Sequence, residues 1–392
     1  MSMIAPNKVY HLVDGVLDEG LGFVSQYVEN MLKLPVIIAD HNGRIQYPNM
    51  NNSDEVDSLF VSIPANISGR DYYYQQDNKY LYYRVRYNSS SAFIIAKNVP
   101  VEQISQALSI LMETKLAIKC YFCKIHKDSD RFEQELAEYL FSNSNASIRD
   151  IATLSENRLE MDRSYVVTLV EVERSSDDPD IQVISSYLYE YLKKNKLEAV
   201  PISRANYITL LIPVCADRDR LDEVLNWPAM IGYKEELEKR FDLSLSQGIG
   251  RVYPLAELQK SFYEARVALT LPRLLGKSHF VQKFSELGLY YPIFCQSLRD
   301  MKDFCLQILG KLIEHDDKTD GELLPTLRKL LDSNVNMKST ADSLFIHVNT
   351  LYYRVSKIEE LLDIDFSDMS SRVNLFIAIK VWDTLKAIDL IV

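Results

Sequence analysis

The residues with the clearest chemical potential lie between Leu323 and Leu362, near the end of a 392-residue chain. Basic and hydrogen-bonding side chains recur there, and such side chains bind the phosphates and base edges of nucleic acid. The whole chain has a formal net charge of -11, which repels nucleic acid unless cations are concentrated locally. Between Leu323 and Ile358 there are five basic residues and only two acidic ones. This local excess of positive charge indicates a DNA-binding surface.

Three short helices are expected to position these side chains, at about 323–334, 335–344 and 345–362. Asn336 is expected to cap the second helix and Asn349 the third, because both side chains can accept hydrogen bonds from free backbone N–H groups. The apolar residues of the third segment recur every three or four positions: Leu351, Val355, Ile358 and Leu362. Two helices joined by a short turn predict a helix-turn-helix, whose second helix enters the major groove.

The side chains expected to contact DNA fall into two groups. Those expected to face the groove or its phosphates are His347, Asn349, Thr350, Tyr352, Tyr353, Arg354 and Lys357. Those expected to hold the DNA backbone are Arg328, Lys329 and Lys338. Tyr353 lies beside the apolar stripe, so it is the member most expected to pack instead. In the alternative reading, Arg354 and Lys357 only solvate the outer face of a core helix.

The run Asn-Thr-Leu-Tyr-Tyr-Arg-Val-Ser-Lys-Ile-Glu-Glu-Leu at 349–361 resembles the recognition helix of PucR/CdaR-type bacterial transcription regulators. The acidic stretch 362–368 and a helix at about 370–388 are similar to the family's closing helix. Val348 and Tyr352 stand where the family commonly has arginine, which predicts weaker phosphate attraction. The resemblance implies double-stranded operator DNA as a partner, a small-metabolite effector, and a homodimer or higher oligomer.

The middle of the chain predicts strands and helices in the order β-α-β-β-α-β-α. The expected strands are 165–172, 198–203, 206–213 and 243–249, and the expected helices are 180–195, 227–241 and 255–271. This order predicts a ferredoxin-like layer of helices on an antiparallel sheet. The block resembles the degenerate GGDEF-like domain of the same regulators. Its turn Ser203-Arg-Ala-Asn206 lacks the glycines and carboxylates of an active diguanylate cyclase, so a scaffold or dimerisation unit is expected rather than a catalyst.

No other constellation supports catalysis. Gly248 and Gly250 lack the third glycine of a phosphate cradle, so a structural role is expected for them. Cys120 and Cys123 with His126 fall short of the four ligands that zinc needs, and a pair of half-buried thiols is expected. The remaining histidines have no companion nucleophile at useful spacing. The sequence therefore predicts no catalytic residue, no metal and no cofactor.

The N-terminal third is expected to be a sensor. It predicts a hairpin at 34–47 with a two-residue Asn-Gly turn, strands at 80–87 and 91–97, and helices at 17–32 and 101–124. This architecture resembles a PAS- or GAF-type sensory domain. The second helix is interpreted either as a signalling helix that pairs with its copy in a dimer or as a plain core helix.

One strand of this sensor has chemically distinct faces. The residues that point to the same side are Tyr80, Tyr82, Arg84 and Arg86. If that face lines a pocket, two guanidiniums and two phenols would suit a small carboxylate or phosphate. The alternative is that Leu81 and Val85 mark the core side and the arginines are solvated.

The gross features favour a multidomain α+β protein of the cytoplasm. No apolar run is long enough to span a bilayer, no signal peptide is evident, and five cysteines at irregular spacing do not suggest a disulfide framework. The expected division is a sensory domain at 1–125, a GGDEF-like domain at 126–280, a helical linker at 281–320 and an all-α helix-turn-helix domain at 321–392. The expected function is a ligand-responsive regulator of a metabolic operon. The alternatives are a non-catalytic protein-interaction scaffold and a cyclic-nucleotide enzyme with a DNA-binding appendage.

Overall fold

The computed structural model describes residues 6–48, 56–87, 90–141, 147–154, 159–173, 181–195, 197–204, 207–214, 227–319 and 321–391. The side chains of residues 6, 7, 57, 125–131, 154 and 227–231 lie outside this description. The chain forms two compact units. Unit 1 comprises residues 1–164, 172–244 and 254–256, and unit 2 comprises residues 165–171, 245–253 and 257–392.

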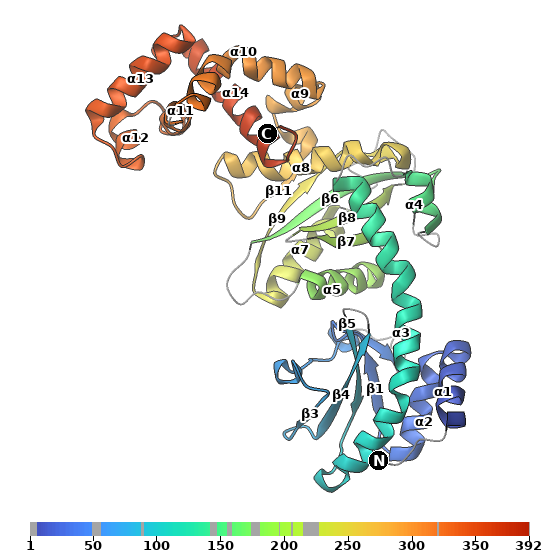
Figure 1. Ribbon diagram of the computed structural model, residues 1–392. Helices are drawn as coiled ribbons and strands as arrows, with labels where there is room; N and C mark the ends of the chain where they lie inside the picture. The colour runs from blue at the N-terminus through green and yellow to red at the C-terminus, as the bar shows by residue number, and fades with distance from the viewer. Residues whose placement is uncertain are drawn as a thin grey trace. The chain divides into compact units, whose positions relative to one another are not determined.

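Unit 1 begins with an antiparallel sheet whose strands are ordered β2-β1-β5-β4-β3 (Figure 1). The strands are β1 Val36–Ala39, β2 Ile45–Tyr47, β3 Tyr72–Gln75, β4 Tyr80–Tyr87 and β5 Ser90–Ala96. Three α-helices accompany them: α1 Pro6–Glu19, α2 Leu21–Leu32 and α3 Ile104–Phe141. Short 3-10 turns lie at Val56–Leu59, Ala65–Ile67 and Val101–Gln103.

Strand β4 has the two faces that its alternation predicts. Leu81 and Val85 are buried in one apolar core with side chains of α1, α2 and α3. Tyr82 lies on the opposite face, in a smaller apolar cluster with Phe93 and Ile67. The helices therefore cover one face of the sheet, and loop residues cover part of the other.

The N-terminal helices differ from the prediction in two places. The helix expected at 17–32 is two helices, because Gly20 adopts φ 78° between α1 and α2. The helix expected to end near Lys124 continues to Phe141. Neither glycine nor proline occurs between Ile104 and Phe141, so no residue there breaks the helix.

The Asn-Gly turn between β1 and β2 is also wider than predicted. A type I′ turn needs positive φ at both central residues, and here only Gly43 has it, at 79°. The Asp40 carboxylate instead accepts backbone N–H groups from Asn42 at 2.9 Å and Arg44 at 3.0 Å. An aspartate-centred loop therefore replaces the two-residue turn.

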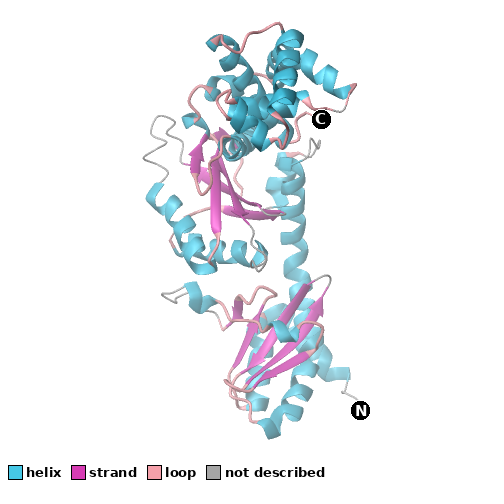
Figure 2. Cartoon of the chain, turned by 90° about the vertical axis from the view of Figure 1, so that its left-hand side faces the viewer, coloured by secondary structure: helices cyan, strands magenta, loops and turns pink. Residues whose placement is uncertain are grey.

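The second sheet has the strand order β11-β9-β6-β8-β7, with β10 beside β6. Its strands are β6 Ser164–Glu173, β7 Val200–Arg204, β8 Tyr207–Val214, β9 Ser244–Ile249, β10 Tyr253–Pro254 and β11 Val281–Lys283. The helices of this region are α4 Ile148–Leu154, α5 Ile181–Lys194, α7 Trp227–Phe241 and α8 Leu258–Leu274. Figure 2 shows helices beside both sheets. The predicted β-α-β-β-α-β-α elements occur in that order, but the short strands β10 and β11 were not predicted. The sheet is mixed because β11 pairs with β9 in parallel.

Gly248 in β9 and Gly250 directly after it have the structural role expected of them. A side chain at Gly248 would collide with the backbone of Ala265 and Leu269 in α8. A side chain at Gly250 would collide with the backbone of Ser261. These glycines therefore allow α8 to lie directly against the strand.

Unit 2 ends in an all-α region that shares one apolar core with α8. Its helices are α9 Tyr290–Phe294, α10 Leu298–Asp317, α11 Leu323–Asp332, α12 Met337–Ser343, α13 Val348–Leu362 and α14 Met369–Ala387. The buried Lys380 ammonium of α14 donates to Asp332 and to the Leu274 carbonyl, both at 2.9 Å. This contact joins the end of α11, the end of α8 and the middle of α14.

Candidate functional site

Helices α12 and α13 form a compact helix-turn-helix. Helix α12 ends in a paired arrangement in which the Ile346 N–H donates to the Ala341 carbonyl and the Phe345 N–H donates to the Asp342 carbonyl, at 3.1 and 3.3 Å. This is a Schellman motif, which reverses the chain within a few residues. The Asn336 side chain caps α12 as predicted, accepting the Ser339 N–H.

The predicted cap of α13 was wrong by two residues. His347 Nδ1, rather than the Asn349 side chain, accepts the backbone N–H of Asn349 at 3.2 Å. The helix therefore starts at Val348, and Asn349 lies within its first turn. As a result the Asn349 amide is exposed and is not used as the cap.

Helix α13 has one buried and one outward face. Leu351, Val355 and Ile358 are buried in the C-terminal core. Because successive residues of an α-helix are about 100° apart, Asn349, Tyr353 and Ser356 lie on the opposite face. All three are exposed, and Tyr353 is 71% exposed, so it does not pack into the core. The sequence reasoning missed Ser356, which the helical spacing of the buried residues would have revealed.

Three of the five basic residues in this segment already have acidic partners. Arg354 Nη2 lies 2.5 Å from a Glu322 carboxylate oxygen, and the Arg354 side chain is only 14% exposed. Arg328 makes a bidentate pair with Asp383 of α14. The Lys357 ammonium lies 2.8 Å from the Glu360 carboxylate, at the surface. Arg354 and Arg328 therefore connect helices of the bundle.

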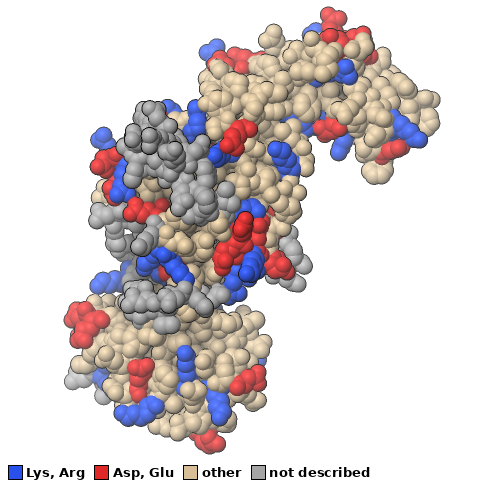
Figure 3. All heavy atoms as spheres, turned by 180° about the vertical axis from the view of Figure 1, so that it is seen from behind, with Lys and Arg blue, Asp and Glu red and all other residues tan. Residues whose placement is uncertain are grey.

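Lys329 and Lys338 are exposed and have no ion-pair partner in the part of the chain that is described. On the face shown in Figure 3, basic and acidic side chains of the C-terminal helices (upper right) are interspersed rather than gathered in one patch. The cations that remain available to phosphate are therefore fewer than the sequence count indicates. Because few cations are available to attract DNA phosphates, any recognition of DNA depends more on the polar and aromatic side chains of the outward face.

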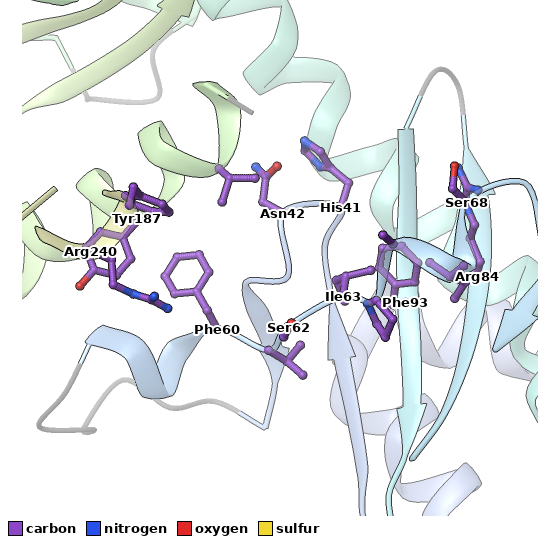
Figure 4. Close-up of a pocket in the computed structure, with 16 residues that line it drawn as sticks. His41, Asn42, Phe60, Ser62, Ile63, Ser68, Arg84, Phe93, Tyr187 and Arg240 are labelled. Atoms are coloured by element: carbon purple, nitrogen blue, oxygen red, sulfur yellow. The ribbon is translucent and has the colours of Figure 1, made fainter. Parts of the chain in front are cut away.

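The predicted ligand residues of β4 are only partly brought together. Arg84 lines a cavity of about 550 Å³ within unit 1, whereas Tyr80, Tyr82 and Arg86 are not among its lining residues. Figure 4 shows Arg84, Ser68 and Phe93 on one side of the cavity and Tyr187 and Arg240 on the other. Arg86 instead pairs with Asp71 at the surface, at 3.5 Å.

Cation and aromatic side chains give this cavity its chemical character. The described lining residues include two arginines and a histidine but no aspartate or glutamate. Arg84 is oriented by a 2.9 Å hydrogen bond from its Nε to Ser91 Oγ. Phe60 and Tyr187 are in ring contact at a centroid distance of 5.7 Å. Such a lining suits a small anion with an apolar part.

Cys120 and Cys123 are half-buried, as expected, and neither forms a disulfide with a described cysteine. A search of the described residues finds no cluster of three or more residues able to hold a metal ion. Among the described helices, none is both long and apolar enough to cross a membrane.

The compact turn and the open face of α13 place the C-terminal region in the helix-turn-helix class of DNA-binding proteins. Family comparison agrees, because residues 323–381 match the PucR C-terminal helix-turn-helix domain and residues 142–271 match a GGDEF-like domain. The match to the helix-turn-helix covers α11, α12, α13 and most of α14, so it includes both helices of the candidate surface.

Three curated relatives come from Bacillus subtilis strain 168. The purine catabolism regulatory protein is 22% identical, covering 94% of this chain and 72% of its own length. The proline-responsive transcriptional activator PutR is 33% identical over 33% of this chain and 32% of its own. The DNA-binding transcriptional activator AdeR is 26% identical over 38% of this chain and 36% of its own. The chain thus carries a PucR-type helix-turn-helix domain and a GGDEF-like domain, and it is similar to these transcription regulators.

Proposed function

We propose that the chain is an effector-responsive regulator of a metabolic operon that binds operator DNA as a homodimer or higher oligomer. The observation that carries this proposal is the outward face of α13, where Asn349, Tyr353 and Ser356 are exposed beside a compact turn. A helix in this position presents its N-terminal residues to base edges in the major groove. Two copies on one operator would read half-sites about one helical turn apart.

The proposed residue roles follow from exposure and chemistry. The Asn349 amide can form a bidentate pair with adenine, and Tyr353 and Ser356 can contact neighbouring bases. Lys329 and Lys338 can neutralise phosphates because both are exposed. The flanking contacts proposed for the same groove come from His347, Thr350, Tyr352 and Lys357. Arg328 and Arg354 act instead by holding α11, α13 and α14 together.

Selection of duplexes from a random-sequence library by the full chain tests DNA recognition. The proposal expects a motif with two related half-sites, and it expects Asn349→Ala to lose the preference for adenine at one position of each half-site. As a matched control, Ser343→Ala changes a residue of α12 whose hydroxyl is already bonded to the Thr340 carbonyl. Failure to enrich any motif would contradict the proposal and favour a protein-interaction scaffold.

We further infer that the N-terminal region is a sensory domain of PAS or GAF type whose effector is a small anion. The cavity that Arg84 lines supports this inference, because its described lining carries cations and aromatic rings without a carboxylate. The names of the purine catabolism regulatory protein and the proline-responsive activator are consistent with control by a small metabolite. On this proposal the sensory domain takes in residues 1–125, residues 126–280 relay its state, and 281–320 link them to the DNA-binding domain at 321–392.

Thermal unfolding with succinate, benzoate or phosphate, and with the neutral succinamide and benzamide, tests this effector class. At least one anion is expected to stabilise the wild type more than its neutral counterpart does, and Arg84→Gln is expected to remove that difference. Arg86→Gln is the matched control, because Arg86 lies on the same face of β4 but outside the cavity. Equal shifts in all three proteins, or no shift with any anion, would contradict the assignment.

The GGDEF-like domain is proposed to connect and pair subunits rather than to catalyse. The turn that would carry the cyclase signature has no glycine and no carboxylate, and its residues 205 and 206 lie outside the described structure. Arg204, one of the two described residues of that turn, lies over the Phe141 ring at 4.8 Å and donates to the Ala137 carbonyl. This residue is therefore engaged with α3. Because operator DNA is its partner, the protein is proposed to act in the cytoplasm.

A further inference from the structure

Phe345 is an apolar side chain in the turn between α12 and α13 that contacts almost nothing in the described part of the protein. It is 96% exposed, more than any other large hydrophobic residue of the described chain. The apolar residues on either side behave differently, since Leu344 and Ile346 both pack against the C-terminal core. The ring is therefore directed outward from a turn whose other apolar side chains are directed inward.

The backbone at Phe345 is unfavourable for this residue type. Its φ is 56°, the left-handed conformation that the Schellman motif requires just after the helix end. Glycine is the usual residue at this position, and a bulky side chain there is strained. Phenylalanine thus contributes neither core packing nor backbone preference to the fold. Any favourable contact of this ring is therefore with a group outside the described chain.

The position of Phe345 shows which molecule is within reach. The residue lies three positions before Val348, the first residue of α13. When a helix-turn-helix docks, the N-terminus of the second helix meets base edges in the major groove. The turn immediately before it therefore also lies beside the groove. Among the groups exposed there, the thymine C5-methyl is the one that a phenylalanine ring contacts favourably.

We propose that Phe345 packs against a thymine methyl in the operator and so helps to select its sequence. The inference rests on the proposed DNA-binding function and adds to it a base-specific contact made by the turn rather than by α13. It predicts that one thymine in each half-site is read through its methyl group, without a hydrogen bond.

The test uses the full chain and an operator obtained by selection with the wild-type protein. Each thymine is replaced in turn by uracil, which lacks only the methyl group, and the dissociation constant is measured by fluorescence anisotropy. Burial of one methyl-sized group corresponds to a roughly 4-fold change in affinity. Uracil at one position of each half-site is therefore expected to weaken wild-type binding about 4-fold per site.

Phe345→Gly is the informative variant because it removes the ring and suits the left-handed backbone, so the fold is retained or stabilised. It is expected to bind the thymine operator more weakly and to be insensitive to uracil at the position that the wild type reads. Asn334→Gly is the matched control. Asn334 occupies the equivalent left-handed position after α11, with φ 51°, and carries no aromatic ring.

The outcomes separate this inference from the proposed function. A uracil effect that is the same in wild type and Phe345→Gly would overturn the methyl contact, as would unchanged affinity of Phe345→Gly. An equal loss of affinity by Phe345→Gly on selected and shuffled duplexes would show a non-specific contact, which also overturns it. Failure of the wild type to bind any duplex would reject DNA binding itself and leave a protein partner as the occupant of this surface.

Discussion

Replacing Arg354 by alanine is expected to loosen the C-terminal helices rather than to remove a phosphate contact. The Arg354 guanidinium forms an ion pair with Glu322 at 2.5 Å and donates a hydrogen bond to Thr326 Oγ1 at 3.3 Å. Glu322 directly precedes α11, and Thr326 lies within it. Thr326 is fully buried and its hydroxyl also donates to the Glu322 carbonyl at 2.7 Å. Arg354 therefore connects the middle of α13 to the start of α11.

The magnitude follows from the groups that are lost. The alanine variant removes two largely buried methylenes, worth about 1.5 kcal/mol in transfer free energy. It also removes an ion pair to Glu322, which is 56% exposed, so that pair contributes roughly 0.2–1 kcal/mol. The free energy of unfolding should therefore fall by about 2 kcal/mol. Arg354→Met retains the apolar stem and should lose about 1 kcal/mol.

A local probe is needed because a chain of several parts unfolds in more than one step. The protein has two tryptophans, and Trp382 is buried in the C-terminal core. In a Trp227→Phe background, tryptophan fluorescence during denaturant unfolding reports on that core alone. In parallel, the salt dependence of operator binding counts phosphate contacts, at about 0.9 in slope for each one. Unchanged unfolding together with a slope reduced by about 0.9 per protomer would refute a structural role for Arg354.

Two further predictions concern the buried carboxylate of Glu264 and the half-buried carboxylate of Glu113. Glu264 is 3% exposed and accepts hydrogen bonds from Arg251 and Tyr253, so Glu264→Gln should destabilise unit 2 by about 3 kcal/mol, measured by thermal unfolding; an unchanged Tm would contradict this. Burial acts to raise the pKa of Glu113, but hydrogen bonds from Lys8 and Tyr27 prevail and hold that pKa below its ordinary value. A lowered folded-state pKa stabilises the fold above the ordinary carboxyl value, and that stabilisation is lost as pH falls through the folded value. In the Glu113→Gln variant, Tm should therefore fall less steeply as the pH is lowered below about 4.5. An equally steep fall in the variant and the wild type would exclude the contacts of Glu113 with Lys8 and Tyr27 as the cause.

The helices and strands were predicted well from the sequence where the conformational preference of each residue agreed with that of its neighbours. Apolar periodicity alone predicted strands β6, β7, β8 and β9 and the bounds of α7, but it missed the short strands β10 and β11. The buried stripe of α13 was also predicted, because Leu351, Val355 and Ile358 repeat at helical spacing. Such signals act within a few residues, so one sequence is sufficient to read them.

Partners distant in the sequence could not be predicted in this way. Arg328 pairs with Asp383, 55 positions later, and Arg354 pairs with Glu322 across two helices. The number of basic residues in the sequence therefore overestimated how many cations are available to contact DNA. The cavity beside Arg84 likewise gathers residues from separate segments of unit 1, which periodicity cannot bring together. Phe345 was overlooked because its significance lies in exposure and in a positive φ, and neither is apparent from an apolar residue in a short turn.

The most direct test of the account is the affinity of the full chain for its selected duplex and for a shuffled duplex of equal composition, measured by anisotropy across a salt series. The account predicts at least about 1000-fold tighter binding to the selected duplex at physiological salt. It also predicts that the Lys329→Gln and Lys338→Gln double variant lowers the salt slope by about 1.8 per protomer. Equal affinity for both duplexes, or no binding at low salt, would contradict the assignment of α13 as a sequence-reading helix.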